Sequence, residues 1–76
     1  MSLTDREQEV YKYLLDGLSY LDIARNLSIG RTTAITHIMN VYMKKLVSNR
    51  SELMAQRIKE LETEVKELRR NSNTRV

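Results

Sequence analysis

The sequence predicts an all-α fold of four helices, the last of which is extended for dimerisation. Three observations support this fold class. Proline is absent, and the aromatic residues are four tyrosines. Apolar residues recur at i, i+4 and i+7, the spacing of helices with one buried face. Within residues 17–46, two predicted helices are joined by a very short turn, so they must cross steeply.

The first helix is predicted from Asp5 to about Asp16. Thr4 followed by Glu7 is the pattern of a capping box, in which each residue bonds the other's backbone N–H. Gly17 is expected to end the helix, because glycine tolerates the left-handed backbone conformation there. The side chains expected in the core are Val10, Tyr13 and Leu14.

The second and third helices are predicted over residues 20–27 and 31–46. Ser19 is the expected N-cap of the second helix, with Asp22 three residues further on. Residues 28–30 form the turn, and Ile29 points into the core. The side chains expected to pack the two helices together are Ile23, Ala24, Leu27, Ala34, Ile38 and Val41.

The fourth helix begins near Asn49, where Asn49 and Glu52 repeat the capping pattern. It carries apolar residues at alternating spacings of four and three, which is a heptad seam. Ile58 and Val65 fall at heptad position a. β-Branched residues at position a with leucine at position d favour a two-stranded parallel coiled coil. The whole predicted dimer interface is Met54, Ile58, Leu61, Val65 and Leu68.

Charges flanking the seam favour self-pairing. Arg57 at g would face Glu62 of a partner helix, and Glu64 would face Arg69, so both pairs are attractive. Antiparallel pairing stays open, as does packing of the stripe on the chain's own first three helices. We therefore divide the chain into a domain at 1–50, a dimerisation helix at 51–70 and a disordered polar tail at 71–76.

Size and composition limit the possible functions. The 76 residues allow one small domain, which often needs a metal, disulfides or a partner chain for stability. With no cysteine and one histidine, neither disulfides nor a metal site is expected, so self-association remains. We expect no cofactor and no catalytic constellation, hence no enzyme. No apolar run approaches the roughly 18 residues of a membrane span. We expect a cytoplasmic protein.

Charge is distributed unevenly along the chain. The net charge is +3, but residues 31–46 carry Arg31, Lys44 and Lys45 and no acid. A basic helix attracts phosphates whatever the total charge. A helix crossing its neighbour steeply is also a probe of the size of the DNA major groove.

Residues along most of the chain resemble one family of bacterial regulators. The matching positions are Leu3-Thr4-x-Arg6-Glu7-x-x-Val10, Gly17-Leu18-Ser19, Ile23-Ala24, Leu27-x-Ile29, Thr33, Thr36-His37, Asn40, Lys44 and Asn49-Arg50-x-Glu52-Leu53. This pattern resembles the DNA-binding domain of LuxR/GerE transcription regulators. The resemblance implies a helix-turn-helix domain whose third helix enters the major groove and whose fourth carries the dimer contact. A stand-alone, GerE-like regulator is expected, either chromosomal or phage-encoded and nucleoid-associated when bound.

The sequence departs from the family pattern at three places. Gly30 stands where a serine usually opens the recognition helix, and Ile35 where a basic residue usually reads a base. The usual Lys-Leu-Gly-Val reads Lys44-Lys45-Leu46-Val47, which puts a lysine where a core residue is expected.

The face of the third helix opposite its buried stripe supplies the candidate base-reading residues: Arg31, Thr32, Ile35, Thr36 and Met39. Threonine, isoleucine and methionine can contact the C5-methyl of thymine, which predicts an A/T-rich site. An alternative is that Ile35 and Met39 pack against a partner protein. His37 is expected at the boundary between domain and DNA as a hydrogen-bonding residue.

Candidate phosphate contacts come from the resemblance and from one local feature. Thr33 and Lys44 match phosphate-contacting positions of the family, and amides at a helix N-terminus bind anions. The full candidate set is Ser19, Tyr20, Thr33, Lys44, Lys45 and Arg50. Glu7 is expected to cap the first helix and to pair with an arginine.

The leading hypothesis is therefore a homodimeric regulator that binds an inverted repeat in double-stranded DNA. RNA polymerase or another transcription regulator are further possible partners. One alternative is a module resembling sigma-factor region 4. The other is an anti-activator or co-regulator that binds another regulator through the coiled-coil helix.

Overall fold

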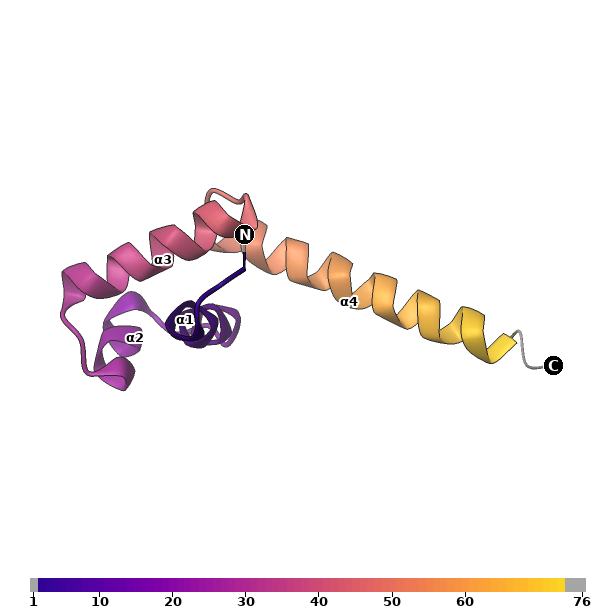
Figure 1. Cartoon of the computed structure of the whole chain (residues 1–76), viewed down its shortest axis with the longest axis horizontal. Helices are drawn as coiled ribbons and strands as arrows, with labels where there is room; N and C mark the ends of the chain where they lie inside the picture. The colour runs from indigo at the N-terminus through magenta and orange to yellow at the C-terminus, as the bar shows by residue number, and fades with distance from the viewer. Residues whose placement is uncertain (1, 74–76) are drawn as a thin grey trace.

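The computed structural model describes residues 2–73 of the chain, with side chains up to residue 68. It holds four helices and no strand over that range: α1 (Asp5–Leu15), α2 (Tyr20–Leu27), α3 (Arg31–Lys45) and α4 (Arg50–Asn73). Figure 1 shows α1, α2 and α3 packed into a body, from which α4 projects as a long arm. The molecule accordingly measures 55 × 22 × 20 Å. The predicted all-α class and the four helices are confirmed.

The start of α1 has the predicted capping box. The Thr4 N–H donates to Glu7 Oε1 at 2.8 Å, and the Glu7 N–H donates to Thr4 Oγ1 at 3.2 Å. The helix ends at Leu15, one residue before the predicted end, because Asp16 is its C-cap. Gly17 follows at φ +87°, the left-handed conformation expected of it.

The unit formed by α2, the turn and α3 follows the sequence prediction closely. Ser19 Oγ accepts from the Asp22 N–H at 3.2 Å, and α2 has the predicted bounds. Ser28 turns the chain at φ 54°, and the Ile29 N–H returns to the Ala24 carbonyl at 3.0 Å. The Ile29 side chain packs against the core, as expected.

One hydrophobic core joins the three helices of the body. Its buried apolar side chains are Val10, Leu14, Ile23, Ala24, Leu27, Ala34, Ile38, Val41 and Leu53. The two alanines, Ala24 on α2 and Ala34 on α3, are both buried, and their small side chains are compatible with close packing of the two helices. Among the side chains of α4 that the structure describes, up to residue 68, Leu53 is the one that is fully buried.

The end of α3 lies one residue earlier than predicted. α3 stops at Lys45, and Leu46 is its C-cap in the left-handed conformation, with φ 60°. The Val47 N–H bonds the Tyr42 carbonyl at 3.0 Å, which completes the helix-ending turn. Leu46 thus occupies the place where the family pattern has glycine, and its side chain is 91% exposed.

The N-cap of α4 is the predicted Asn49, but the return bond from Glu52 goes to a different residue than a capping box requires. Asn49 Oδ1 accepts from the Glu52 N–H at 2.9 Å. The Glu52 carboxylate, however, accepts from the Ser48 N–H at 2.9 Å instead of that of Asn49.

The far end of α4 corrects the predicted tail. The helix continues to Asn73, so residues 71–73, which were expected in the tail, are helical. The rest of that tail, residues 74–76, lies outside the described residues. No helix in the described range is long and apolar enough to cross a membrane.

Candidate nucleic-acid interface

The outward face of α3 carries all five candidate base-reading residues. In Figure 1, α3 lies along one edge of the body with one side turned away from α1 and α2. The buried stripe of Ala34, Ile38 and Val41 holds the opposite side against the core. Exposed side chains on the free side are those of Arg31, Thr32, Ile35, Thr36 and Met39. The predicted residues therefore share one accessible helix face, as the major groove requires.

The exposed face has an apolar flank that runs further than predicted. Ile35 is 43% exposed and Met39 55%, and the flank continues through Met43 at 69% and Leu46 at 91%. Sequence reasoning missed Met43 and Leu46. Met43 follows Ile35 and Met39 at spacings of four, which is the signal that would have placed it on the same face.

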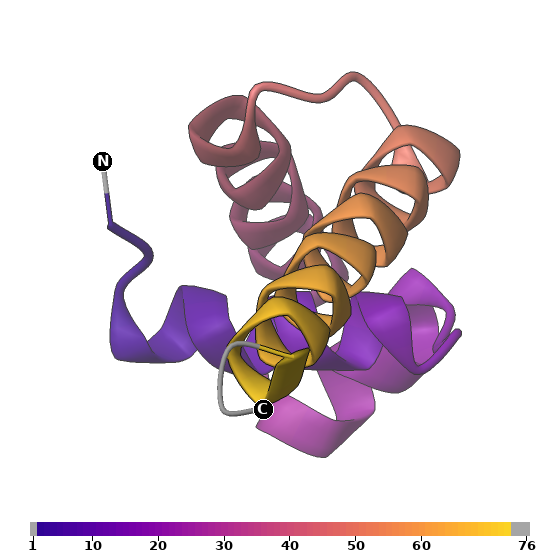
Figure 2. The same ribbon diagram turned by 90° about the vertical axis from the view of Figure 1, so that its right-hand side faces the viewer.

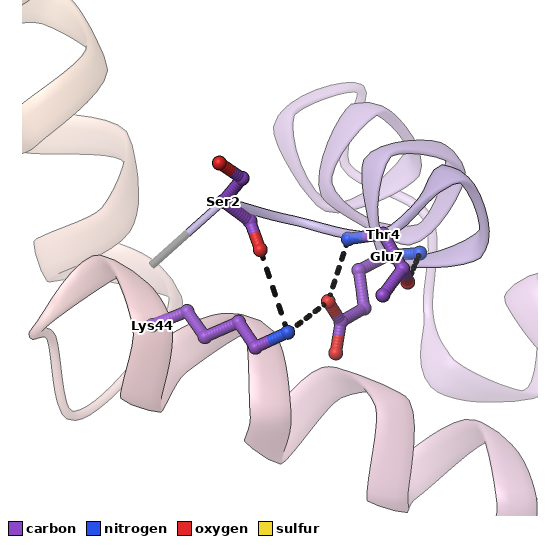
Figure 3. Close-up of polar contacts among 4 residues, drawn as sticks. All are labelled: Ser2, Thr4, Glu7 and Lys44. Carbon is purple, nitrogen blue, oxygen red and sulfur yellow. Dashed lines mark hydrogen bonds and ion pairs between the residues drawn. The ribbon is translucent and has the colours of Figure 1, made fainter.

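Lys44 is held by an ion pair inside the domain, as Figure 3 shows. Its Nζ lies 2.7 Å from Glu7 Oε1 and 3.5 Å from the Ser2 carbonyl oxygen. The Lys44 side chain is 22% exposed and that of Glu7 is 7% exposed. The prediction that Glu7 pairs with an arginine was wrong, because its partner is Lys44. Arg6 instead pairs with Glu9 at 3.3 Å.

The electrostatics of Glu7 follow from these contacts. Its hydrogen bond with the Lys44 ammonium, and then that from the Thr4 N–H, lower the pKa of the carboxyl below its ordinary value of 4.5. Glu7 therefore stays ionised and links the start of α1 to the last turn of α3.

Lys45 stands where the family pattern has a core residue, but its side chain is only half-buried. Its ammonium lies 4.6 Å from the centroid of the Tyr11 ring, a cation–π contact. Gln56 Nε2 donates to the Lys45 carbonyl at 2.8 Å, which ties α4 to the end of α3. Burial raises the pKa of the Tyr11 hydroxyl. The lysine at this position therefore places its ammonium over the Tyr11 ring at the end of α3.

The other candidate phosphate contacts lie at three places on the body. Ser19 and Tyr20 are exposed at the N-terminus of α2, Thr33 is exposed on α3, and Arg50 is half-buried at the start of α4. Ser19 Oγ is engaged as the cap, so free backbone amides are what that helix end can offer an anion.

Two further polar residues of α3 have defined surroundings. The Thr36 hydroxyl donates to the Thr32 carbonyl at 3.0 Å, which leaves its methyl group and oxygen lone pairs accessible. His37 is half-buried at the side of the exposed face.

The apolar seam of α4 does not pack on the chain's own helices. Met54, Ile58, Leu61, Val65 and Leu68 are between 39% and 65% exposed. The alternative of self-packing is therefore wrong, because Leu53, one residue out of phase with the seam, makes the contact with the body. Figure 2, which looks along α4, shows the arm extending from the body toward the viewer.

A shallow groove lies along the apolar seam of α4. A groove of about 360 Å³ is lined by Ile58, Leu61, Glu62, Val65 and Lys66. Four of these residues have the spacing i, i+3, i+4 and i+7, which is the hole that accepts one knob of a facing helix. Beside it, Arg57 lies 3.2 Å from Glu60 and 3.8 Å from Glu64.

Comparison with known proteins identifies the family of residues 1–56. The family described as "Bacterial regulatory proteins, luxR family" matches residues 1–56. The HTH-type transcriptional regulator MalT of Vibrio campbellii is 42% identical over 50 residues, which are 66% of this chain and 6% of that protein. The CsgBAC operon transcriptional regulatory protein of Escherichia coli is 40% identical over 53 residues, 70% of this chain and 24% of that protein.

A third relative also matches most of this chain but only a small part of its own length. The probable transcriptional regulatory protein SgaR of Hyphomicrobium methylovorum is 43% identical over 54 residues, 71% of this chain and 26% of that protein. The chain therefore spans about a quarter or less of the length of these curated relatives. No solved structure matches the chain at a comparable level.

Residues 1–56, which hold α1, α2, α3 and the first turns of α4, are thus a DNA-binding helix-turn-helix domain of transcription regulation. The chain belongs to the LuxR family of bacterial regulatory proteins.

Proposed function

We propose that the chain acts as a homodimer that binds an inverted-repeat site in double-stranded DNA through α3. The observation that carries this proposal is the two-sided character of α3. One side is fixed in the core by Ala34, Ile38 and Val41, and the other exposes a set of side chains of groove-reading type. The family match makes DNA the ligand that such a face is expected to bind.

Base reading is assigned to the exposed side chains of α3. Ile35 and Met39 supply apolar groups for the C5-methyl of thymine, while Thr32 and Thr36 supply methyl and hydroxyl groups. Arg31 at the start of the helix reaches a base edge or a phosphate. The scarcity of guanine-reading groups on this face supports an A/T-rich half-site.

Phosphate contacts are assigned to the residues around that face. Amides near Ser19 and Tyr20 bind one phosphate through the α2 N-terminus, and Thr33 and Arg50 contact others. Lys44 and Lys45 add positive charge while keeping their intramolecular contacts. An ammonium group has three N–H donors, so Lys44 can hold Glu7 and still donate to a phosphate.

Dimerisation is assigned to the exposed seam of α4, from Met54 to Leu68. A second copy of the helix would cover these side chains, and the groove beside Leu61 has the form of a knob-accepting hole. Two joined copies present two recognition helices to successive major grooves, about 34 Å apart on one face of DNA. We place this activity in the bacterial cytoplasm, at the nucleoid when bound.

The proposal is tested by selecting bound duplexes from a random library at near-physiological salt. We expect an A/T-rich inverted repeat with fixed spacing between its halves. Enrichment of G-rich sites would contradict the base-reading assignment, and half-sites without fixed spacing would contradict the dimer.

A second candidate is a co-regulator that binds another transcription regulator through α4. The exposed apolar side chains favour it, because the α4 seam is 39–65% exposed and Met43 and Leu46 extend an exposed apolar flank at the end of α3. In this case the selection yields no enriched sequence, and binding is weak and depends on salt alone. The match to the LuxR family favours that family over a sigma region 4-like module.

A further inference from the structure

Three of the four methionines, Met39, Met43 and Met54, lie outside the core. The sequence has four methionines and no cysteine, so thioethers are its only sulfur groups. None of the nine buried apolar side chains within the described residues is a methionine. Met39 and Met43 are 55% and 69% exposed on α3, and Met54 is 39% exposed on the α4 seam. These three side chains therefore meet solvent on the surfaces to which binding is assigned.

We propose that Met39 is an oxidation-sensitive site, at which a peroxide weakens operator binding without unfolding the chain. The inference rests on the proposed function, because Met39 lies among the base-reading residues. It adds a chemical modification that changes the reading face.

The reaction is an oxygen-atom transfer. The Met39 sulfur attacks one oxygen of hydrogen peroxide, an S–O bond forms and the O–O bond breaks. The sulfur loses two electrons to become a sulfoxide, and the departing hydroxide takes up the proton released by the new S–OH group and leaves as water. Access of the peroxide needs no opening of the fold, because the side chain is already 55% exposed.

The effect on binding follows from the polarity of the product. A thioether is apolar and fits against a thymine methyl group, whereas a sulfoxide oxygen is a strong hydrogen-bond acceptor. Burying that oxygen against a methyl group leaves it without a donor. The fold is unaffected, because the core of the body contains no thioether to oxidise.

Met43 provides the matched control on the same helix. It is exposed like Met39 and lies one turn further along the same face, but it is outside the base-reading set. Leucine is the replacement of choice because it has similar volume and no sulfur. Both test variants carry M54L, so that oxidation at the seam does not enter the comparison.

The experiment treats M43L/M54L and M39L/M54L with hydrogen peroxide and compares each with its own untreated form. Peptide mass spectrometry verifies the added oxygen, and circular dichroism verifies the helical content. We expect oxidised M43L/M54L, which keeps Met39, to bind the selected operator roughly tenfold more weakly. Oxidised M39L/M54L should keep its untreated affinity, and methionine sulfoxide reductase should restore binding by the first variant.

Two outcomes would overturn the inference. In one, M43L/M54L with fully oxidised Met39 binds as tightly as before treatment. In the other, oxidised M39L/M54L loses as much affinity, which would place the sensitive group elsewhere. If the untreated wild-type chain binds no selected duplex, the proposed function itself fails, and that result is seen before any peroxide is added.

Discussion

The body and the α4 arm use apolar side chains in opposite ways. In the body they meet in one core, where Val10, Leu14 and Ile23 are fully buried. On the arm, Ile58, Leu61 and Val65 are 43–56% exposed although their types are those of a core. The difference shows that similar apolar periodicity can form a core in one segment and leave an exposed apolar stripe in another.

Leu53 marks the boundary between the two regions. It is fully buried and lies beside Met54, which begins the exposed seam. Adjacent helical positions point about 100° apart, so α4 can contact the body through one face and a partner through the next. The body can therefore fold while the seam remains available.

The largest expected effect comes from removing that anchor. Leu53→Ala deletes fully buried methyl groups and leaves a cavity, so the free energy of unfolding should fall by about 2–5 kcal/mol. Urea denaturation followed by circular dichroism measures the change. Leu61→Ala is the matched control on the arm, and at concentrations where the chain is monomeric it should change stability by less than about 0.5 kcal/mol. Equal losses in the two variants would remove the distinction between anchor and seam.

The next effect concerns acid sensitivity, which we place in the body at Glu7. Because its pKa is lower in the folded chain, its contribution to stability is present above the ordinary value of 4.5. That contribution is lost as the pH falls through the folded pKa. The urea midpoint should therefore drop as the pH is lowered from above 4.5 through the folded pKa of Glu7, and it should drop less in Glu7→Gln.

Lys44→Met serves as the partner control for this pair. It removes the ammonium that lies 2.7 Å from Glu7, so it should reduce the acid dependence in the same direction. Acid dependence of wild-type size in Glu7→Gln would show that other carboxyls govern the response.

A smaller effect is expected where the body ends and the arm begins. Leu46→Gly should stabilise the chain by about 1 kcal/mol, because φ 60° costs a leucine more than a glycine. The reverse change, Gly17→Ala at φ +87°, should destabilise by about the same amount even though no atom lies within 4 Å of the added Cβ. Thermal unfolding of both variants measures the pair. Destabilisation by Leu46→Gly would mean that the exposed leucine side chain makes a contact of its own.

The smallest effect concerns the start of α3. Gly30 is the N-cap, with φ −71° and no side-chain hydrogen bond, and nothing lies within 4 Å of a Cβ added there. Gly30→Ser should stabilise by a few tenths of a kcal/mol, because serine can accept from a free N–H of the first turn. The shift in melting temperature measures it, with Thr4→Ala, a loss of about 1 kcal/mol, as the opposite change at a capped helix. A lower melting temperature for Gly30→Ser would indicate that the glycine is needed for the turn.

The sequence predicted what depends on neighbours a few residues apart. The capping pairs Thr4–Glu7 and Ser19–Asp22 are three residues apart, so their geometry follows once a helix forms. The exposed face of α3 was predicted in the same way, since a buried stripe fixes what lies opposite.

Contacts between segments far apart in the sequence could not be predicted from such local patterns. Glu7 and Lys44 are 37 residues apart and meet because α1 and α3 cross, which no local pattern encodes. Periodicity also left open whether the α4 stripe would face the body, because a core and a coiled coil use the same residue types. The structure shows that the stripe faces away from the body, because α4 contacts the body through Leu53 and then extends beyond it.

The most direct test of the account compares an inverted-repeat duplex with a single half-site in equilibrium binding titrations. The wild-type chain should bind the repeat at least roughly tenfold more tightly than the half-site, because pairing through α4 makes the second contact intramolecular. Leu61→Glu should bind both duplexes with the same half-site affinity, since a charge on the seam prevents pairing while the body remains folded. Retention of the full preference for the repeat by Leu61→Glu would contradict the division of roles between body and arm.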